Sequence, residues 1–370
     1  MRLLVMKPSL LSVLLCSVLL CGCNAAKQSA STPTPTPTPT ATVAVGSDPV
    51  ALAVNSVTNE IYVASGVSGS VTVIDGTTNN TTTVAVGGGP VAVAVNSVTN
   101  QIYAAIIGTN SMTVIDGTTN NTTTVAVGTS PIALAVNPTT NQIYVANQGS
   151  NSVTVIDGTT NNTTTVATGV SPGAVAVNSV TNQIYVANEG SNSVTVIDGT
   201  TNNTTTVATG ISPGAVAVNS VTNQIYVVNF GSVANNGSSS VTVIDGTTND
   251  TTTVAVGTGP GAVAVNSVTN QIYVANEGSG VTVIDGATNN TTTVAVGRAP
   301  CGVAVNPNTN QIYLGDNEAG SNTVTVIDGA TNNTTTVAVG SDPIALAVNS
   351  VTNETYVANN QSNNVTVLTP

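Results

Sequence analysis

The sequence contains no histidine and no tryptophan, one phenylalanine, and only four basic residues against sixteen acidic ones. Without histidine, the chain has no imidazole ligand for a metal and no histidine base for a catalytic triad. Four scattered basic residues cannot neutralise the phosphates of a nucleic acid, which takes clustered positive charge. The composition therefore excludes a nucleic-acid-binding protein and the commonest catalytic sites, and we expect no cofactor.

The first twenty-three residues have the pattern of an export signal that ends in a lipid-attachment site. Arg2 and Lys7 precede the apolar run LLSVLLCSVLL at residues 10–20, which is too short to span a membrane comfortably. The next letters, CGC, end at Cys23 and resemble the lipobox of bacterial lipoproteins, in which the last cysteine becomes the acylated first residue. We expect residues 1–22 to be removed and Cys23 to carry acyl chains such as palmitate. The alternative is an ordinary secretory signal that happens to contain cysteines.

Residues 23–41 are expected to form a stalk, because the alternation STPTPTPTPTAT that starts at residue 31 favours an extended, polyproline-like backbone. Removal of the signal would leave Lys27 and Arg298 as the only basic residues. It would also leave Cys301 without a partner for a disulfide, because Cys23 is acylated. Cys301 begins a predicted strand, and we expect it to be packed and inert.

The rest of the chain repeats one module, marked by a tyrosine every 40 to 47 residues (Tyr62, Tyr103, Tyr144, Tyr185, Tyr226, Tyr273, Tyr313 and Tyr356). Each period holds four short β-branched runs, such as residues 50–55, 60–64, 71–75 and 81–87, which is the content of a propeller blade. The segment opens with a lone fourth strand (40–46) and closes after a third strand (365–368). This predicts an all-β, eight-bladed propeller over residues 42–370 that is closed by pairing of these two strands, with the tyrosines packed between blades. A seven-bladed ring with one extruded blade is the alternative.

The motif NQIYVAN, at residues 141–147, 182–188 and 270–276, is followed in two copies by SNSVTVIDGTTN. These residues resemble the YVTN-type β-propeller repeat of bacterial and archaeal surface proteins, and the resemblance covers about nine tenths of the chain. It implies a propeller fold. It implies little about activity, because the family includes surface-layer and adhesive proteins, and related propellers host lactonases and metal enzymes.

One aspartate followed by glycine recurs at the end of seven of the eight third strands (Asp75, Asp116, Asp157, Asp198, Asp245, Asp285 and Asp328). We interpret it as turn chemistry, in which the carboxylate accepts a backbone N–H and the glycine takes a positive φ. The alternative is a ring of Ca²⁺ sites. Calcium needs several converging oxygens, and the motif DGTTNN offers one acid followed by neutral side chains, so the turn interpretation is favoured and no metal is expected.

The copies differ unevenly between the two faces of the predicted propeller. On one face the turns NSVTNQ and DGTTNN recur almost unchanged, whereas on the other the blade connections and the second-to-third loops vary. The rarer side chains fall on this variable face: Asp48, Glu189, Phe230, Glu277, Arg298, Asp316, Glu318 and Asp342. Loops on a rigid scaffold commonly carry recognition, so these residues are predicted to form a binding face. Two alternatives are drift in tolerant loops and a local ion pair between Arg298 and the acids near it.

Together these features predict an exported, lipid-anchored propeller of the cell envelope, held on the outer membrane or cell surface by Cys23. We expect it to bind an envelope protein or a glycan through the variable face without being an enzyme. A metal-dependent or lactonase-like hydrolase that uses loop carboxylates is the alternative function. A purely structural surface-layer spacer is a further one.

Overall fold

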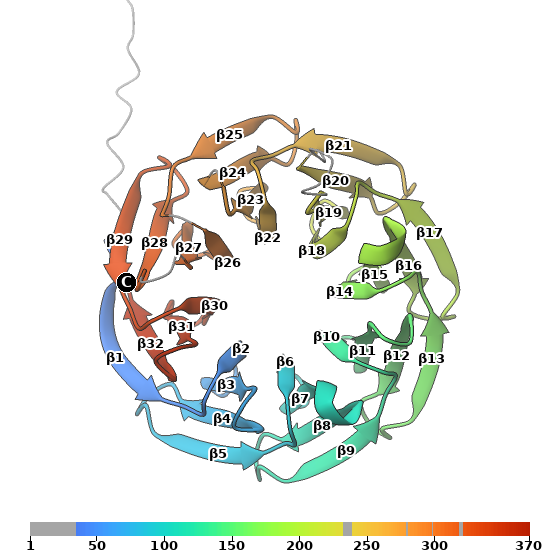
Figure 1. Ribbon diagram of the computed structural model, residues 1–370, viewed down its shortest axis with the longest axis horizontal. Helices are drawn as coiled ribbons and strands as arrows, with labels where there is room; N and C mark the ends of the chain where they lie inside the picture. The colour runs from blue at the N-terminus through green and yellow to red at the C-terminus, as the bar shows by residue number, and fades with distance from the viewer. Residues whose placement is uncertain (1–34, 232–238, 279, 298, 318–320) are drawn as a thin grey trace, which may run out of the picture. The chain divides into compact units, whose positions relative to one another are not determined.

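The computed structural model describes residues 35–370 except 232–238, 279, 298 and 318–320, and these form the unit Pro35–Pro370. The predicted export signal, the predicted lipidation site Cys23 and the predicted stalk up to residue 34 lie outside the described residues. The described chain forms eight antiparallel sheets of four strands each, arranged as a ring (Figure 1). The protein is a single eight-bladed β-propeller, which confirms the predicted fold and overturns the seven-bladed alternative.

The strands fall into four concentric sets (Figure 1). The innermost strands are β2 (Pro49–Asn55), β6 (Pro90–Asn96), β10 (Pro131–Asn137), β14 (Pro172–Asn178), β18 (Pro213–Asn219), β22 (Pro260–Asn266), β26 (Pro300–Asn306) and β30 (Pro343–Val348). The second strands are β3 (Glu60–Ser65), β7 (Gln101–Ile106), β11 (Gln142–Asn147), β15 (Gln183–Asn188), β19 (Gln224–Asn229), β23 (Gln271–Asn276), β27 (Gln311–Asp316) and β31 (Thr355–Asn359).

The third strands are β4 (Ser70–Asp75), β8 (Ser111–Asp116), β12 (Ser152–Asp157), β16 (Ser193–Asp198), β20 (Ser240–Asp245), β24 (Gly280–Asp285), β28 (Thr323–Asp328) and β32 (Asn364–Thr369). The rim strands are β5 (Thr81–Ala85), β9 (Thr122–Ala126), β13 (Thr163–Ala167), β17 (Thr204–Ala208), β21 (Thr251–Ala255), β25 (Thr291–Val294), β29 (Thr334–Ala338) and β1 (Thr38–Ala44). Two short 3-10 helices, η1 (Ile107–Thr109) and η2 (Glu189–Ser191), lie in second-to-third loops. We number the blades one to eight from β2.

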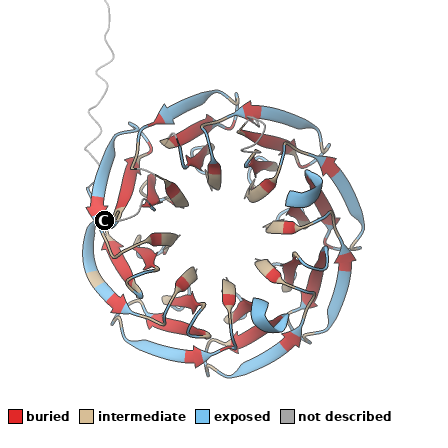
Figure 2. Cartoon of the chain, viewed as in Figure 1, coloured by how far each residue is buried: buried red, intermediate tan, exposed pale blue. Residues whose placement is uncertain are grey.

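Side-chain burial follows the position of each strand in its blade (Figure 2). The second and third strands are buried along most of their length, and the innermost strands are half-buried. On each rim strand of the TTTVA type the threonines are exposed and the valine is buried. β-branched residues suit such pleated, half-buried surfaces, which explains why a chain rich in valine and threonine forms this fold.

The ring is closed by strands from the two ends of the described chain. Strand β1 lies beside β32 (Figure 1). The two strands pair antiparallel, with Val43 opposite Val365. This confirms the predicted closure but shifts the first strand from 40–46 to Thr38–Ala44. The prolines of this segment are tolerated because the rim strand has a free edge and the register shifts between Pro39 and Ala41.

Each pair of adjacent blades shares one hydrophobic cluster built around a tyrosine. Tyr62 of blade one, for example, packs with Ile102, Ala104 and Ile115 of blade two. Tyr356 of blade eight packs with Ile61 of blade one and so completes the ring. All eight tyrosines are at most 1% exposed, which confirms their predicted role between blades.

Candidate functional site

The recurring aspartates form turns, as predicted. Asp75 Oδ1 accepts the backbone N–H groups of Thr77 (2.8 Å) and Thr78 (2.9 Å), and these hydrogen bonds hold the pKa of Asp75 below its usual value. The predicted positive φ of the glycine is wrong. The left-handed residue of this turn is Asn79 (φ 59°), and glycine follows Asp75 for a different reason, which is close packing.

That packing involves asparagines that link each blade to the next. A Cβ on Gly76 would lie 2.5 Å from Oδ1 of Asn59, so only glycine fits there. Asn59 Oδ1 also accepts a 2.6 Å hydrogen bond from Nδ2 of Asn349 in blade eight. The same bond recurs at every blade junction: Asn55–Asn100, Asn96–Asn141, Asn137–Asn182, Asn178–Asn223, Asn219–Asn270, Asn266–Asn310 and Asn306–Asn353. We call this side of the ring the turn face.

The side chains of the turn face therefore hold adjacent blades together, and this explains why its sequence hardly varies. The donor asparagines at the ends of the inner strands are completely buried, where an unpaired amide would be costly. Sequence reasoning missed this network. The signal was present, because an asparagine ends each first strand and another precedes each second strand except in blade eight, where Glu354 intervenes.

The opposite side of the ring holds its loops on a uniform backbone frame. Each inner strand begins with a proline, and the residue before that proline has a positive φ, between 50° and 75° (Asp48, Gly89, Ser130, Ser171, Ser212, Gly259, Ala299 and Asp342). Its carbonyl accepts the N–H of the first residue after the second strand at 2.8–3.2 Å. The first residue after the second strand is therefore held at an equivalent backbone position in all eight blades.

We call these eight positions the loop ring. Its members are Gly66, Ile107, Gln148, Glu189, Phe230, Glu277, Asn317 and Asn360. They comprise six residue types on one repeated backbone geometry, in contrast to the near-identity of the turn face. The loop ring therefore places different side chains at equivalent points around one face.

The structure places the predicted site residues unevenly on this face. Glu189, Phe230 and Glu277 are consecutive, exposed members of the loop ring. Asp48 and Asp342 instead occupy the left-handed positions before the prolines, and Asp48 Oδ1 accepts the amide of Asn360. Arg298 and Glu318 lie outside the described residues, so the ion pair suggested for Arg298 stays a prediction.

Asp316 is not part of a binding surface. Its side chain is 1% exposed, and its carboxylate accepts the hydroxyls of Thr323 (2.8 Å) and Thr325 (3.0 Å). Burial raises the pKa of Asp316. It takes the position that an asparagine, such as Asn147, holds in five other blades, so its charge marks a variation in the core rather than an exposed recognition group.

Cys301 is half-buried and makes no disulfide. Its Sγ lies 3.5 Å from the carbonyl oxygen of Pro343 and 3.8 Å from that of Gly315, both possible acceptors for the thiol proton. Burial raises the pKa of Cys301, so the thiol stays protonated at neutral pH. This agrees with the predicted packed, unreactive cysteine.

A cleft of about 370 Å³ lies on the loop-ring side of blades five to seven, where Phe230, Glu277 and Cys301 line it together. Its lining residues are Phe230, Gly231, Gly259, Pro260, Gly261, Glu277 and Cys301. The cleft depends on Gly261, the second residue of β22. A Cβ there would have only Glu277 Oε1 nearby, at 3.9 Å, whereas blades one, two, three and eight carry valine or isoleucine at this position.

The propeller is similar in fold to a solved structure of hydrazine synthase from Kuenenia stuttgartiensis. The two chains are 19% identical with a TM-score of 0.61, and the alignment covers 87% of this chain and 96% of the other. No protein-family model and no curated protein matches the sequence. The comparison thus supports the fold alone.

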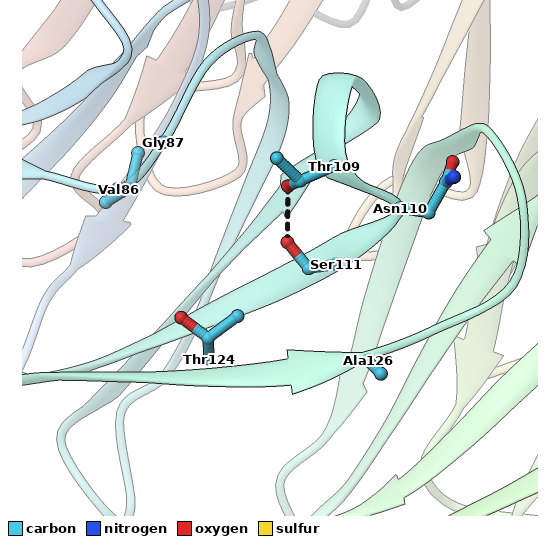
Figure 3. Close-up of a pocket in the computed structure, with 7 residues that line it drawn as sticks. All are labelled: Val86, Gly87, Thr109, Asn110, Ser111, Thr124 and Ala126. Atoms are coloured by element: carbon cyan, nitrogen blue, oxygen red, sulfur yellow. Dashed lines mark hydrogen bonds between the residues drawn. The ribbon is translucent and has the colours of Figure 1, made fainter.

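A second cleft, of about 450 Å³, lies on blade two near the end of η1 (Figure 3). Val86, Gly87, Thr109, Asn110, Ser111, Thr124 and Ala126 line it. The hydroxyls of Thr109 and Ser111 bond to one another at 2.7 Å. The lining carries no ionisable group and no aromatic ring, so it offers less chemistry for recognition than the cleft beside Phe230.

Within residues 35–370, gaps excepted, no three histidine, cysteine, aspartate or glutamate side chains converge as a metal site would require. The same part of the chain contains no lysine, arginine or histidine, so none of its carboxylates has a cationic neighbour among the described residues. No helix in this part is long and apolar enough to cross a membrane.

Proposed function

We propose that this protein is a lipid-anchored, extracytoplasmic propeller that binds a macromolecule of the cell envelope through its loop ring, without catalysing a reaction. The observation that carries the proposal is the contrast between the two faces. Both have a repeated backbone geometry, yet only the loop ring changes its side chain from blade to blade. A face selected only for stability would be expected to repeat its side chains as the turn face does.

The chemistry of the cleft supports a binding role over an enzymatic one. Cys301 is held as a neutral thiol, and Glu277 has no histidine or second acid beside it in the lining with which to share a proton transfer. Each turn aspartate is committed to backbone N–H groups. A hydrolase built on these carboxylates would lack the paired acid and base that such chemistry uses.

The sequence of the first forty residues supports the anchor. The charged start, the short apolar run and the lipobox-like CGC at residues 21–23 would attach the protein to the membrane through Cys23, and the Thr/Pro-rich stalk would hold the propeller away from the lipid. Outer-membrane or cell-surface placement and membership of the YVTN-repeat surface proteins belong to the same proposal. A binding face on a tethered scaffold suits adhesion or envelope assembly.

Affinity capture from an envelope extract tests this function. The bait is the full chain with Cys23→Ser. Its variant also carries Glu189→Gln, Phe230→Gln and Glu277→Gln, because glutamine already occupies the equivalent loop-ring position in blade three, as Gln148. The control carries Glu60→Gln and Glu354→Gln, which remove the same two charges on the turn face, where six blades already have glutamine. We expect a partner that the control retains and the variant loses. Equal capture by both would contradict a role for the loop ring.

A further inference from the structure

The single phenylalanine is held firmly at the edge of the 370 Å³ cleft. The N–H of Phe230 donates to the carbonyl of Ser212 at 3.0 Å, and its ring packs directly on the backbone of Gly214, where a Cβ would overlap the ring. The side chain is still 38% exposed. The fold therefore presents part of an aromatic surface on the loop-ring side, with its position fixed by glycine at the start of β18.

Two carboxylates lie on either side of this ring. Glu277, the next member of the loop ring, has its N–H bonded to the carbonyl of Gly259 at 2.8 Å and lines the cleft together with Phe230. Glu189, the preceding member, accepts the hydroxyl of Ser212 at 3.2 Å. The carbonyl of Ser212 accepts the N–H of Phe230, so the carboxylate of Glu189 is bonded to the same residue that positions the phenylalanine.

The lining indicates which chemistry would fit. An aromatic ring beside a carboxylate, here Phe230 beside Glu277, attracts a cation through the π-system of the ring and the negative charge of the acid. The remaining walls are glycine, proline and a neutral thiol, which suit the methylene stem of a lysine or arginine. A sugar would need several polar partners for its hydroxyls, and this lining provides few. The volume is at the low end for ligand pockets, which is enough for one long side chain.

We propose that this cleft binds a lysine or arginine side chain that projects from a partner protein. The inference rests on the proposed binding function of the loop ring and adds the ligand class. The absence of basic residues from the described chain means that a cation must come from another molecule or from residues outside that part. Sixteen acids against four basic residues would also favour the approach of a basic partner.

The single phenylalanine makes the test direct. Carbon-13 labelling of phenylalanine in the full chain, purified in detergent, gives ring signals from Phe230 alone, and these are followed by NMR. The probes are N-acetyl-lysine methylamide and its arginine counterpart, compared with the uncharged N-acetyl-norleucine methylamide and with methyl glucoside. We expect a saturable shift of the ring signals with the two basic probes, with millimolar dissociation constants, and none with the other two.

Variants locate the effect. Glu277→Gln should weaken binding of the basic probes at least fivefold, and Gly261→Val should abolish it by filling the cleft. Valine is tolerated at this position in blades one and two, as Val50 and Val91, so the fold should survive. Glu60→Gln, on the turn face, should bind as the wild type does.

The proposal is overturned if the basic probes cause no saturable shift, if the norleucine probe binds equally, or if both cleft variants bind normally. Binding of methyl glucoside alone would assign the cleft to a glycan instead. The envelope capture distinguishes failure of the cationic cleft from failure of the binding function. A partner retained by Glu277→Gln but lost by the triple loop-ring variant would refute the cationic cleft and leave the binding function standing, whereas no loop-ring-dependent partner would refute that function.

Discussion

Val43 gives a quantitative test of ring closure. It is the buried residue of β1 and is 6% exposed. It packs in one cluster with Ile61 of blade one and with Tyr356 and Val365 of blade eight. Val84 occupies the equivalent position on β5, is also 6% exposed, and belongs to a rim strand that is continuous with its own blade. Val43→Ala and Val84→Ala therefore make the same change in a strand from the far end of the chain and in a local one.

We expect both substitutions to cost about 2 kcal/mol. Each removes two methyl groups from a buried site, at about 0.8 kcal/mol per group, and leaves a small cavity. The two values should agree within about 0.5 kcal/mol if β1 completes blade eight as β5 completes blade one. If β1 did not pair with β32, Val43 would be a surface residue and its substitution would change stability by less than about 0.5 kcal/mol.

Urea unfolding followed by circular dichroism measures the difference. Both variants should lower the midpoint by a similar amount without changing the slope, since neither alters the surface exposed on unfolding. A Val43→Ala midpoint equal to that of the wild type, with the Val84→Ala midpoint shifted, would show that β1 does not complete blade eight. Deletion of residues 35–44 should lower the midpoint further, because it exposes β32 along its whole length.

Three other predictions concern the anchor, the buried Asp316 and the packing around Gly76. Cys23→Ser should move the protein from the membrane to the soluble fraction after cell lysis, and continued need for detergent would contradict the anchor. Because burial raises the pKa of Asp316, ionisation of this carboxyl lowers the stability of the fold at pH values above its unfolded pKa. Asp316→Asn should therefore raise the unfolding free energy at pH 7 by about 1 kcal/mol. It should give no gain in acid, where the carboxyl is protonated, and urea unfolding at both pH values measures the difference. Gly76→Ala should cost about 1–3 kcal/mol because its Cβ meets Asn59, whereas Gly88→Ala, with open space around it, should be nearly neutral in the same assay.

Much of the fold was predictable because the sequence repeats. The tyrosine spacing and four β-branched runs per period predicted blade number and strand order, and the unpaired first and last strands predicted closure. The limits of the first strand were missed, because the alternating threonine and proline of residues 32–40 is typical of a stalk. Only the pairing with β32 shows that Thr38 already belongs to the rim.

The candidate site was only partly predictable. Loop variability identified Glu189, Phe230 and Glu277, but it also selected Asp316, whose charge is buried in the core. Rarity of a residue type does not distinguish an exposed group from an internal substitution. The cleft itself depends on the missing side chain of Gly261, and an open space is visible only when neighbouring blades are placed together.

Site-specific photo-cross-linking reports which face of the propeller touches a partner in intact cells. A photoreactive amino acid replaces Ile107, an exposed member of the loop ring, or Val57, an exposed residue of the turn face. We predict a covalent adduct with an envelope component from position 107 and none from position 57. Adducts from position 57 alone, or equally from both, would contradict the assignment of binding to the loop ring.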